Sequence, residues 1–93
     1  MIIGVLRLEI YLPFAGSLKD KRSVLKSLKD RLRGKFNVAV AEVEPDEKWQ
    51  RAWLGVSTVG TDRRFVDSYL SQVVDWVRAT RAAELIRVEQ ELL

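Results

Sequence analysis

The segment from Ser17 to Lys35 concentrates the positive charge of this 93-residue chain. It contains eight bases and two acids, Asp20 and Asp30, and so carries a net charge of +6, whereas the remaining residues sum to −3 within a total of +3. A concentrated positive field attracts phosphate groups at long range, whatever the base sequence of the nucleic acid. The segment therefore predicts a polyanionic partner.

Five of these bases share one stripe of the helix that we expect here. Because successive helical residues advance by about 100°, the five fall within a narrow arc beside the apolar residues, along roughly 21 Å. A row of that length can follow several phosphates of ribosomal or other structured RNA, while the alternative is an ordinary solvated helix face. The proposed phosphate-binding residues are Lys19, Arg22, Lys26, Lys29 and Arg33.

Carboxylates near residue 45 form a second group of side chains that could bind a metal ion or act as an acid and a base. Glu42 and Glu44 are predicted to share one face of a strand, and Asp46 and Glu47 follow, so that a magnesium site or an acid–base pair is conceivable. Solvated edge-strand acids are the alternative. The chain has no histidine or cysteine, which removes the usual zinc ligands, imidazole bases and thiol nucleophiles. With no phosphate-binding glycine loop either, we expect no enzyme, cofactor or metal.

The spacing of apolar residues predicts the elements that position these groups. Alternation indicates strands over about 2–12, 37–44, 49–59 and 84–89, with Ile86 and Val88 on one side of the last, and we expect residues 91–93 to fray. Helical spacing indicates one helix that starts at Ser17 and ends at Gly34 in a left-handed turn, and another capped by Thr61. Their expected buried positions are Leu18, Val24, Leu25, Leu28 and Leu32 in the first, and Val66, Leu70, Val73 and Val77 in the second.

The resulting order, β-α-β-β-α-β, is that of a ferredoxin-like α+β sandwich. We expect a single domain over residues 1–93, with a four-stranded antiparallel sheet in the order 4-1-3-2 and two helices on one face. The other sheet face is then left open to solvent or to a partner.

Apolar and aromatic side chains on that open face suggest self-association as an alternative function. Val5, Tyr11 and Trp53 are predicted to point outward from the two central strands, where a second subunit would cover them. Base stacking on Trp53 and Tyr11 is the other interpretation, and the negative charge of Glu9 on the same face disfavours it. We therefore expect a homo-oligomer, with a dimer as its simplest form.

Three aromatic residues line the flank of the second helix: Phe65, Tyr69 and Trp76. Either they pack against the first helix or cap the edge of the sheet, or they join a partner interface. The chain has no signal peptide and no long apolar run, which favours a cytoplasmic protein without membrane contact. Ten arginines against six lysines fit a heat-adapted source.

The stretch SLKDKRSVLKSLKDRLRGKFNVAVAEVEPDEKWQRAWLGV, from Ser17 to Val56, resembles the YlxP-like family of small bacterial proteins of unassigned function, and the opening MIIGVLRLEIYLP extends the resemblance to the start. The resemblance implies a ferredoxin-like fold. Through the frequent placement of the family's genes beside those for translation initiation and ribosome maturation, it also implies a role near the ribosome. It supplies no established catalytic residues.

Overall fold

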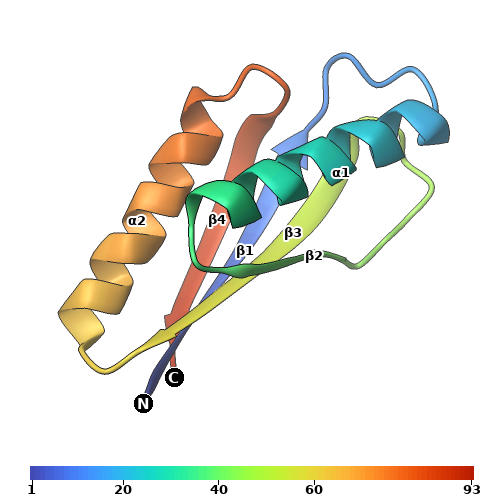
Figure 1. Cartoon of the computed structure of the whole chain (residues 1–93). Coiled ribbons are helices and arrows are strands. Elements are labelled where there is room, and N and C mark those ends of the chain that lie inside the picture. Colours follow the sequence, from blue (N-terminus) through green and yellow to red (C-terminus); the bar gives the residue numbers. More distant parts are fainter.

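Four antiparallel strands form one sheet, and two helices cover one of its faces (Figure 1). The computed structural model describes all residues, 1–93. In chain order the elements are β1 (Ile2–Tyr11), α1 (Leu18–Lys35), β2 (Ala39–Val43), β3 (Arg51–Gly60), α2 (Arg63–Ala79) and β4 (Glu84–Leu92). The strands lie in the order β2-β3-β1-β4, which is the predicted 4-1-3-2 read from the other edge. The ferredoxin-like α+β fold is therefore confirmed.

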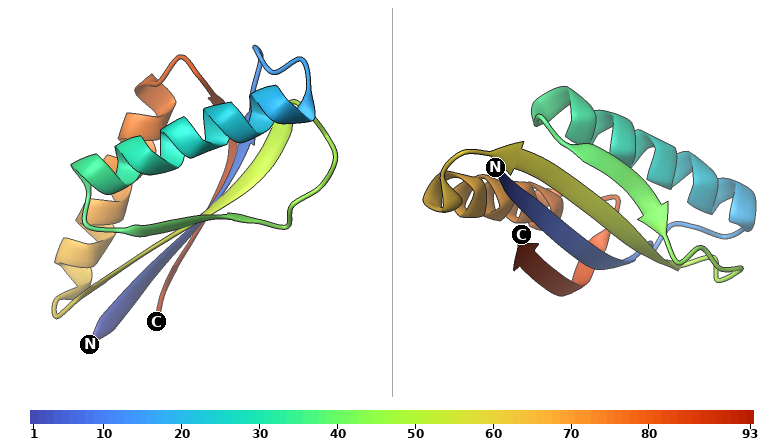
Figure 2. Two further views of the ribbon diagram at one scale, coloured as in Figure 1. Left: turned by 45° about the vertical axis from the view of Figure 1, so that its right-hand side comes forward. Right: turned by 90° about the horizontal axis from the view of Figure 1, so that it is seen from below.

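The core lies between the sheet and the two helices, which sit on the same side of the twisted sheet (Figure 2). Alternate residues of β1 and β3 face it, because side chains on a strand point to opposite faces in turn. The predicted helical stripes also lie there, except that Leu18 and Val24 are only partly buried. Among the fully buried side chains are Leu6, Leu8, Leu28, Leu32, Leu54, Val66, Leu70 and Val77.

The helix ends differ in part from the prediction. Ser17 is the N-cap of α1, as predicted, and its hydroxyl accepts the backbone N–H of Asp20 at 3.1 Å. Gly34 does not end α1 in a left-handed turn: the helix continues to Lys35, and the extended Phe36 then places its ring in the core. For α2 the N-cap is Asp62 and not Thr61, because the Asp62 carboxylate reaches the N–H of Arg64 at 3.1 Å.

Strand β4 (Glu84–Leu92) is longer than predicted, and the fraying predicted for residues 91–93 is wrong. It pairs with β1 as far as Leu92, whose side chain packs against the core. Leu93 and Ile3 then exchange two backbone hydrogen bonds, of 2.8 and 2.7 Å. The C-terminus is thus tied to the start of the chain.

A register shift in β4 also contradicts the predicted alternation of Ile86 and Val88. The pairing of β1 with β4 shifts between Glu9 and Ile10, so that Ile10 lies opposite Leu85. Leu85 packs against the core and Ile86 is exposed, since an extra residue in one strand changes which side chains point inward.

Neither helix of the chain is long and apolar enough to span a membrane.

Candidate nucleic-acid interface

Packing of α1 fixes the direction in which its basic stripe faces. On one side of the helix, Arg31 lies with its guanidinium 4.9 Å from the ring of Trp76 in α2. On the other side, Arg33 donates a 2.6 Å hydrogen bond to the carbonyl oxygen of Val40 in β2. The stripe therefore runs along the side of α1 that faces away from α2, next to the edge strand β2, and Lys29 is half-buried there. Its residues are Lys19, Arg22, Lys26, Lys29 and Arg33.

Carboxylates neutralise only part of this basic stripe. Asp30, which borders it, lies 3.0 Å from the ammonium of Lys26 and 3.4 Å from the guanidinium of Arg33. The hydrogen bond from Lys26 is the main reason why the pKa of Asp30 is lowered. Lys19, Arg22 and Lys29 have no carboxylate oxygen within 4.0 Å. Five cations thus share one anion, and the stripe keeps a net positive charge.

Lys21 lies outside the stripe and is a structural residue. It is only 3% exposed, and its ammonium donates to the carbonyl oxygen of Lys48 at 2.7 Å and to Asp46 Oδ1 at 3.1 Å. The pKa of Asp46 is lowered, first by the backbone N–H of Lys48 and then by the hydrogen bond from Lys21. One of the eight bases in this segment therefore fastens the loop between β2 and β3 to α1.

The predicted pairing of Glu42 and Glu44 on one strand face is wrong. Glu42 points toward the helix side, 3.8 Å from Lys21, whereas the Glu44 carboxylate lies 2.8 Å from Arg7 on the open face. Glu44 has a φ of 52°, a left-handed conformation that ends β2 and redirects the side chain. The chain holds no group of three or more acidic, histidine or cysteine side chains arranged to bind a metal ion.

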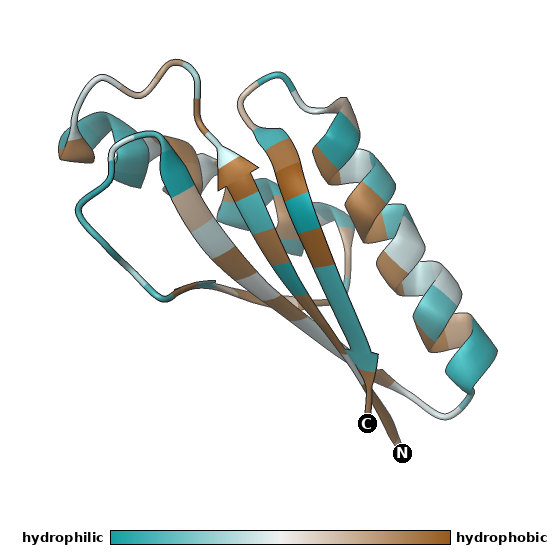
Figure 3. Cartoon of the chain, turned by 180° about the vertical axis from the view of Figure 1, so that it is seen from behind, coloured by the Kyte–Doolittle hydropathy of each residue, from teal (hydrophilic) through white to brown (hydrophobic).

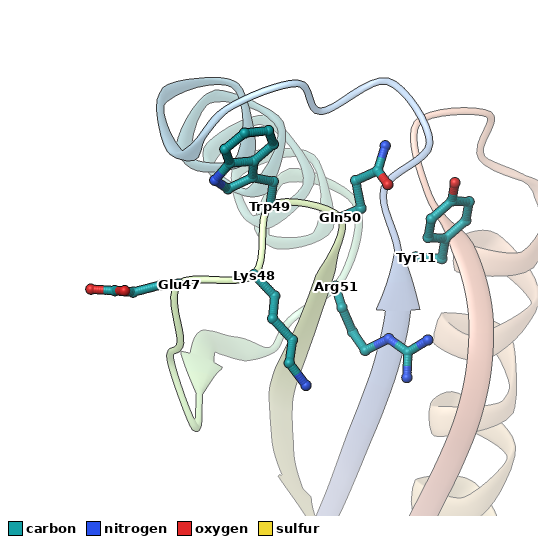
Figure 4. A pocket seen from close by; sticks show the side chains of 6 residues that line it. All are labelled: Tyr11, Glu47, Lys48, Trp49, Gln50 and Arg51. Carbon is teal, nitrogen blue, oxygen red and sulfur yellow. The ribbon is translucent and has the colours of Figure 1, made fainter.

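An open depression of about 670 Å³ lies where β1 ends and β3 begins, shown in Figure 4. Glu47, the remaining acid of the predicted cluster, is at its rim. Trp49 is 54% exposed, and the ammonium of Lys48 has no carboxylate partner. The six lining residues are Tyr11, Glu47, Lys48, Trp49, Gln50 and Arg51. Sequence reasoning missed Lys48, Trp49 and Gln50 as site residues, although a tryptophan beside a lysine in a charged loop was an available signal.

On the open sheet face, arginines of the same chain cover Trp53. The Arg7 guanidinium lies 4.5 Å from the centre of the Trp53 ring, and that of Arg87 lies 5.9 Å from it. Arg7 is held there by Glu44 at 2.8 Å and by Glu89 at 2.5 Å. Because cations occupy the ring, Trp53 offers less surface for base stacking or subunit contact than the sequence suggested.

Glu9 is buried on this face rather than presented to solvent. It is 7% exposed, and its carboxylate lies 3.2 Å from Arg51 and 3.8 Å from Arg87. Its charge is therefore balanced within the sheet and projects little field outward. Figure 3 views the strands from this side, and it shows that the second half of β4 is mostly hydrophilic.

The six residues predicted for a subunit interface fall in four different surroundings. Trp53 lies beneath Arg7, and Tyr11 lines the depression described above. Val5 belongs to an apolar groove on the open face near β2, with Ala39, Ala41, Val43 and Gly55. The remaining three, Phe65, Tyr69 and Trp76, form the flank of α2 that faces α1.

Most of this aromatic flank packs within the chain. Tyr69 meets the Phe36 ring edge-on with centroids 5.8 Å apart, and its hydroxyl accepts the backbone N–H of Asn37 at 2.7 Å. Trp76 lies beneath Arg31. Phe65 stacks on Tyr69 but stays 61% exposed. Packing of Tyr69 and Trp76 at the C-terminal end of α1 agrees with the first of the two interpretations.

Comparison with known proteins gives two consistent matches. Residues 3–90 match the family described as "Protein of unknown function (DUF503)". The chain is also 36% identical over 76 residues to "Uncharacterized protein YlxP" of Bacillus subtilis (strain 168), and the match covers 82% of this chain and 83% of that protein. Since the family match spans nearly the whole chain, and the resemblance noted in the sequence agrees with it, this chain belongs to the DUF503 family.

Proposed function

We propose that this chain is a non-enzymatic module that binds the phosphate backbone of structured RNA, ribosomal or other, through the basic stripe of α1. The observation that carries the proposal is that Lys19, Arg22 and Lys29 have no carboxylate partners in the chain. Lys19 and Arg22 are exposed, and Lys29 is half-buried. Free cations in a row are suited to successive phosphates and read no base sequence.

An exposed aromatic side chain beside the stripe adds support. The carbonyl oxygen of Lys48 is bonded to Lys21, so the loop that carries Lys48 and Trp49 lies against the N-terminal half of α1. Single-stranded nucleic acids bind where cations follow the backbone and aromatic rings stack on bases. Trp49 therefore replaces the covered Trp53 as the residue on which an unpaired base would stack.

The ribosomal setting rests on the gene neighbourhood that the family resemblance implies.

Most of the binding free energy in this proposal comes from phosphate neutralisation, so affinity should fall steeply with salt. Each phosphate neutralised contributes about −0.9 to the slope of log affinity against log salt on duplexes, and about −0.7 on single strands. Three free cations thus predict a slope of roughly −2 to −3.

A charge-reversal series tests the proposal with the purified protein and a fluorescently labelled ribosomal RNA fragment. The stripe variant combines Lys19→Glu, Arg22→Glu and Lys29→Glu. The control combines Arg63→Glu, Arg64→Glu and Arg81→Glu, which makes the same change in net charge. These three arginines lie outside α1, are exposed and have no carboxylate partner. We expect the stripe variant to lose binding and most of the salt slope, and the control to keep the slope.

Equal losses in the two variants would show that only net charge matters and would refute the stripe as a site. The alternative function, self-association through the open sheet face, stays a prediction with less support. Its central aromatic residue, Trp53, is covered by Arg7, and its charged side chains are paired with one another.

A further inference from the structure

Strand β4 leaves a long edge of the sheet without a partner. It is the outermost strand on its side and runs for nine residues, and no side chain of the chain hydrogen-bonds to its backbone. The opposite edge differs: β2 has only five residues, and Arg33 already occupies the carbonyl oxygen of Val40. An unpaired edge strand is a template for pairing with another strand.

The hydrogen bonds at the C-terminus show which groups of β4 point outward. Leu93 and Ile3 bond to each other in both directions, so they form a hydrogen-bonded pair. Such pairs recur at every second residue of an antiparallel ladder, which turns the backbone groups of Arg87, Glu89 and Glu91 toward β1. The N–H and C=O groups of Val88, Gln90 and Leu92 consequently face the free edge.

We propose that β4 pairs in antiparallel fashion with β4 of a second copy of this chain, about a two-fold axis at Val88. The Val88 backbone of each copy bonds to the partner's Val88, and the sheet continues through both subunits. In this register Arg87 lies opposite the partner's Glu89, and Glu89 opposite the partner's Arg87. Opposite charges at directly facing positions stabilise strand pairs, and a two-fold interface presents each such contact twice.

Each neighbouring register sets like charges opposite each other, even though an axis at Glu89 also pairs Arg87 with the partner's Glu91. An axis at Glu89 sets that carboxylate against its own copy, and an axis at Arg87 does the same with two guanidinium groups. An axis at Gln90 sets Glu89 against the partner's Glu91. Like charges that face each other directly are destabilising, so the charge pattern of β4 selects the axis at Val88.

Helix α2 flanks the β4 edge in Figure 3. It carries one acid and one base, Asp67 and Arg78, that can form opposite-charge contacts across the same two-fold axis. Asp67 marks one end of the contact, because its carboxylate accepts a 2.5 Å hydrogen bond from Gln90. Arg78 marks the other end, where it shares a surface depression with Leu85. Gln90 lies two residues after Val88 and Leu85 three residues before it, so the same axis turns Asp67 toward the partner's Arg78.

This interface leaves the basic stripe exposed, because α1 and β2 lie at the opposite edge of the sheet. Each dimer would present two stripes. The inference rests on β4 and α2 alone and is independent of the proposed RNA binding.

Sedimentation velocity over a range of protein concentrations tests the proposal. We expect the wild-type chain to form dimers, and the Arg87→Glu and Glu89→Arg chains each to be monomeric when alone, since each variant sets like charges opposite each other. Mixed in equal amounts, the two variants should form heterodimers, because every facing pair is then of opposite charge. Far-UV circular dichroism of each variant confirms that it is folded.

A second pair of variants avoids the contacts that Arg87 and Glu89 make within the chain. The Asp67→Arg and Arg78→Asp chains should likewise be weakened as homodimers and restored when mixed. A monomeric wild type at all concentrations, or folded variants that dimerise alone as well as the wild type does, would overturn the proposal. A dimer that survives both sets of β4 and α2 variants but is lost in Trp53→Glu would assign the contact to the open sheet face instead.

Discussion

The ammonium group of Lys21 donates a 2.7 Å hydrogen bond to the carbonyl oxygen of Lys48, across 27 positions of the chain. Lys21 occupies the inward side of α1, in line with Leu25, Leu28 and Leu32. Its aliphatic stem covers apolar surface there, and its charged end reaches the loop between β2 and β3. A single buried cation thus holds together the two segments that form the candidate RNA-binding surface.

Replacing this cation should loosen the loop. Lys21→Met keeps much of the apolar stem and removes the donor to Lys48 and Asp46, so we expect a loss of about 1–3 kcal/mol in the free energy of unfolding. Urea denaturation followed by circular dichroism measures it. Lys19→Met, at an exposed position of the same turn, should change stability by less than about 0.5 kcal/mol. Equal effects of the two substitutions would contradict the anchoring role of Lys21.

The Asp46 carboxylate makes this contact dependent on pH. Its pKa is lowered in the folded chain by the Lys48 N–H and by Lys21. The group therefore contributes stability that is present above the unfolded-state pKa of about 3.9 and is lost as the pH falls through the lowered value. Below about pH 4, we expect the Tm of the Asp46→Asn variant to decrease less than that of the wild type. Thermal scans from neutral to acidic pH compare the two, and identical pH profiles would exclude this contribution.

Sequence reasoning recovered the elements whose apolar spacing is regular. The alternation in β1 and the stripe from Val66 to Val77 in α2 are set by burial, and burial decides the face of a strand or helix whatever its partners are. The strand ends were less predictable. β4 continues past Glu89 because Leu92 finds a core position beside β1, a long-range contact that no local pattern reveals.

The sequence indicated which residues line the candidate site, but not the contacts that these residues and their neighbours make. Helical spacing left Lys21 out of the stripe and in line with Leu25, but it could not show which groups the Lys21 ammonium contacts. These contacts depend on a loop that returns to α1 only in the folded chain. The covering of Trp53 by Arg7 is likewise a contact between strands, and one left-handed residue, Glu44, helps to hold that arginine in place.

Close packing of β1 against α2 gives a prediction about Gly4. A methyl group added at Gly4 would lie 2.6 Å from Val66 and 2.8 Å from Leu70, both fully buried. We expect Gly4→Ala to destabilise the chain by about 1–3 kcal/mol through overpacking. Gly34→Ala is the matched control, because an added methyl group meets nothing within 4 Å and lies in a helix. It should stabilise by about 0.5–1 kcal/mol. In urea titrations, a stabilising shift for Gly4→Ala would contradict the overpacking, and a destabilising shift for Gly34→Ala would contradict its role as a control.

The hydroxyl of Tyr69 links α2 to the segment that follows α1, because it accepts the N–H of Asn37 at 2.7 Å. Tyr69→Phe keeps the ring contacts with Phe36 and Phe65 and removes only this acceptor, so we expect a loss of about 0.5–1.5 kcal/mol in unfolding free energy. Tyr11→Phe is the control, since the Tyr11 hydroxyl has no hydrogen-bond partner in the chain. It should leave the urea midpoint unchanged. If the two variants shift the midpoint equally, the Tyr69 hydroxyl does not stabilise the turn after α1, and the position of the aromatic flank depends on ring packing alone.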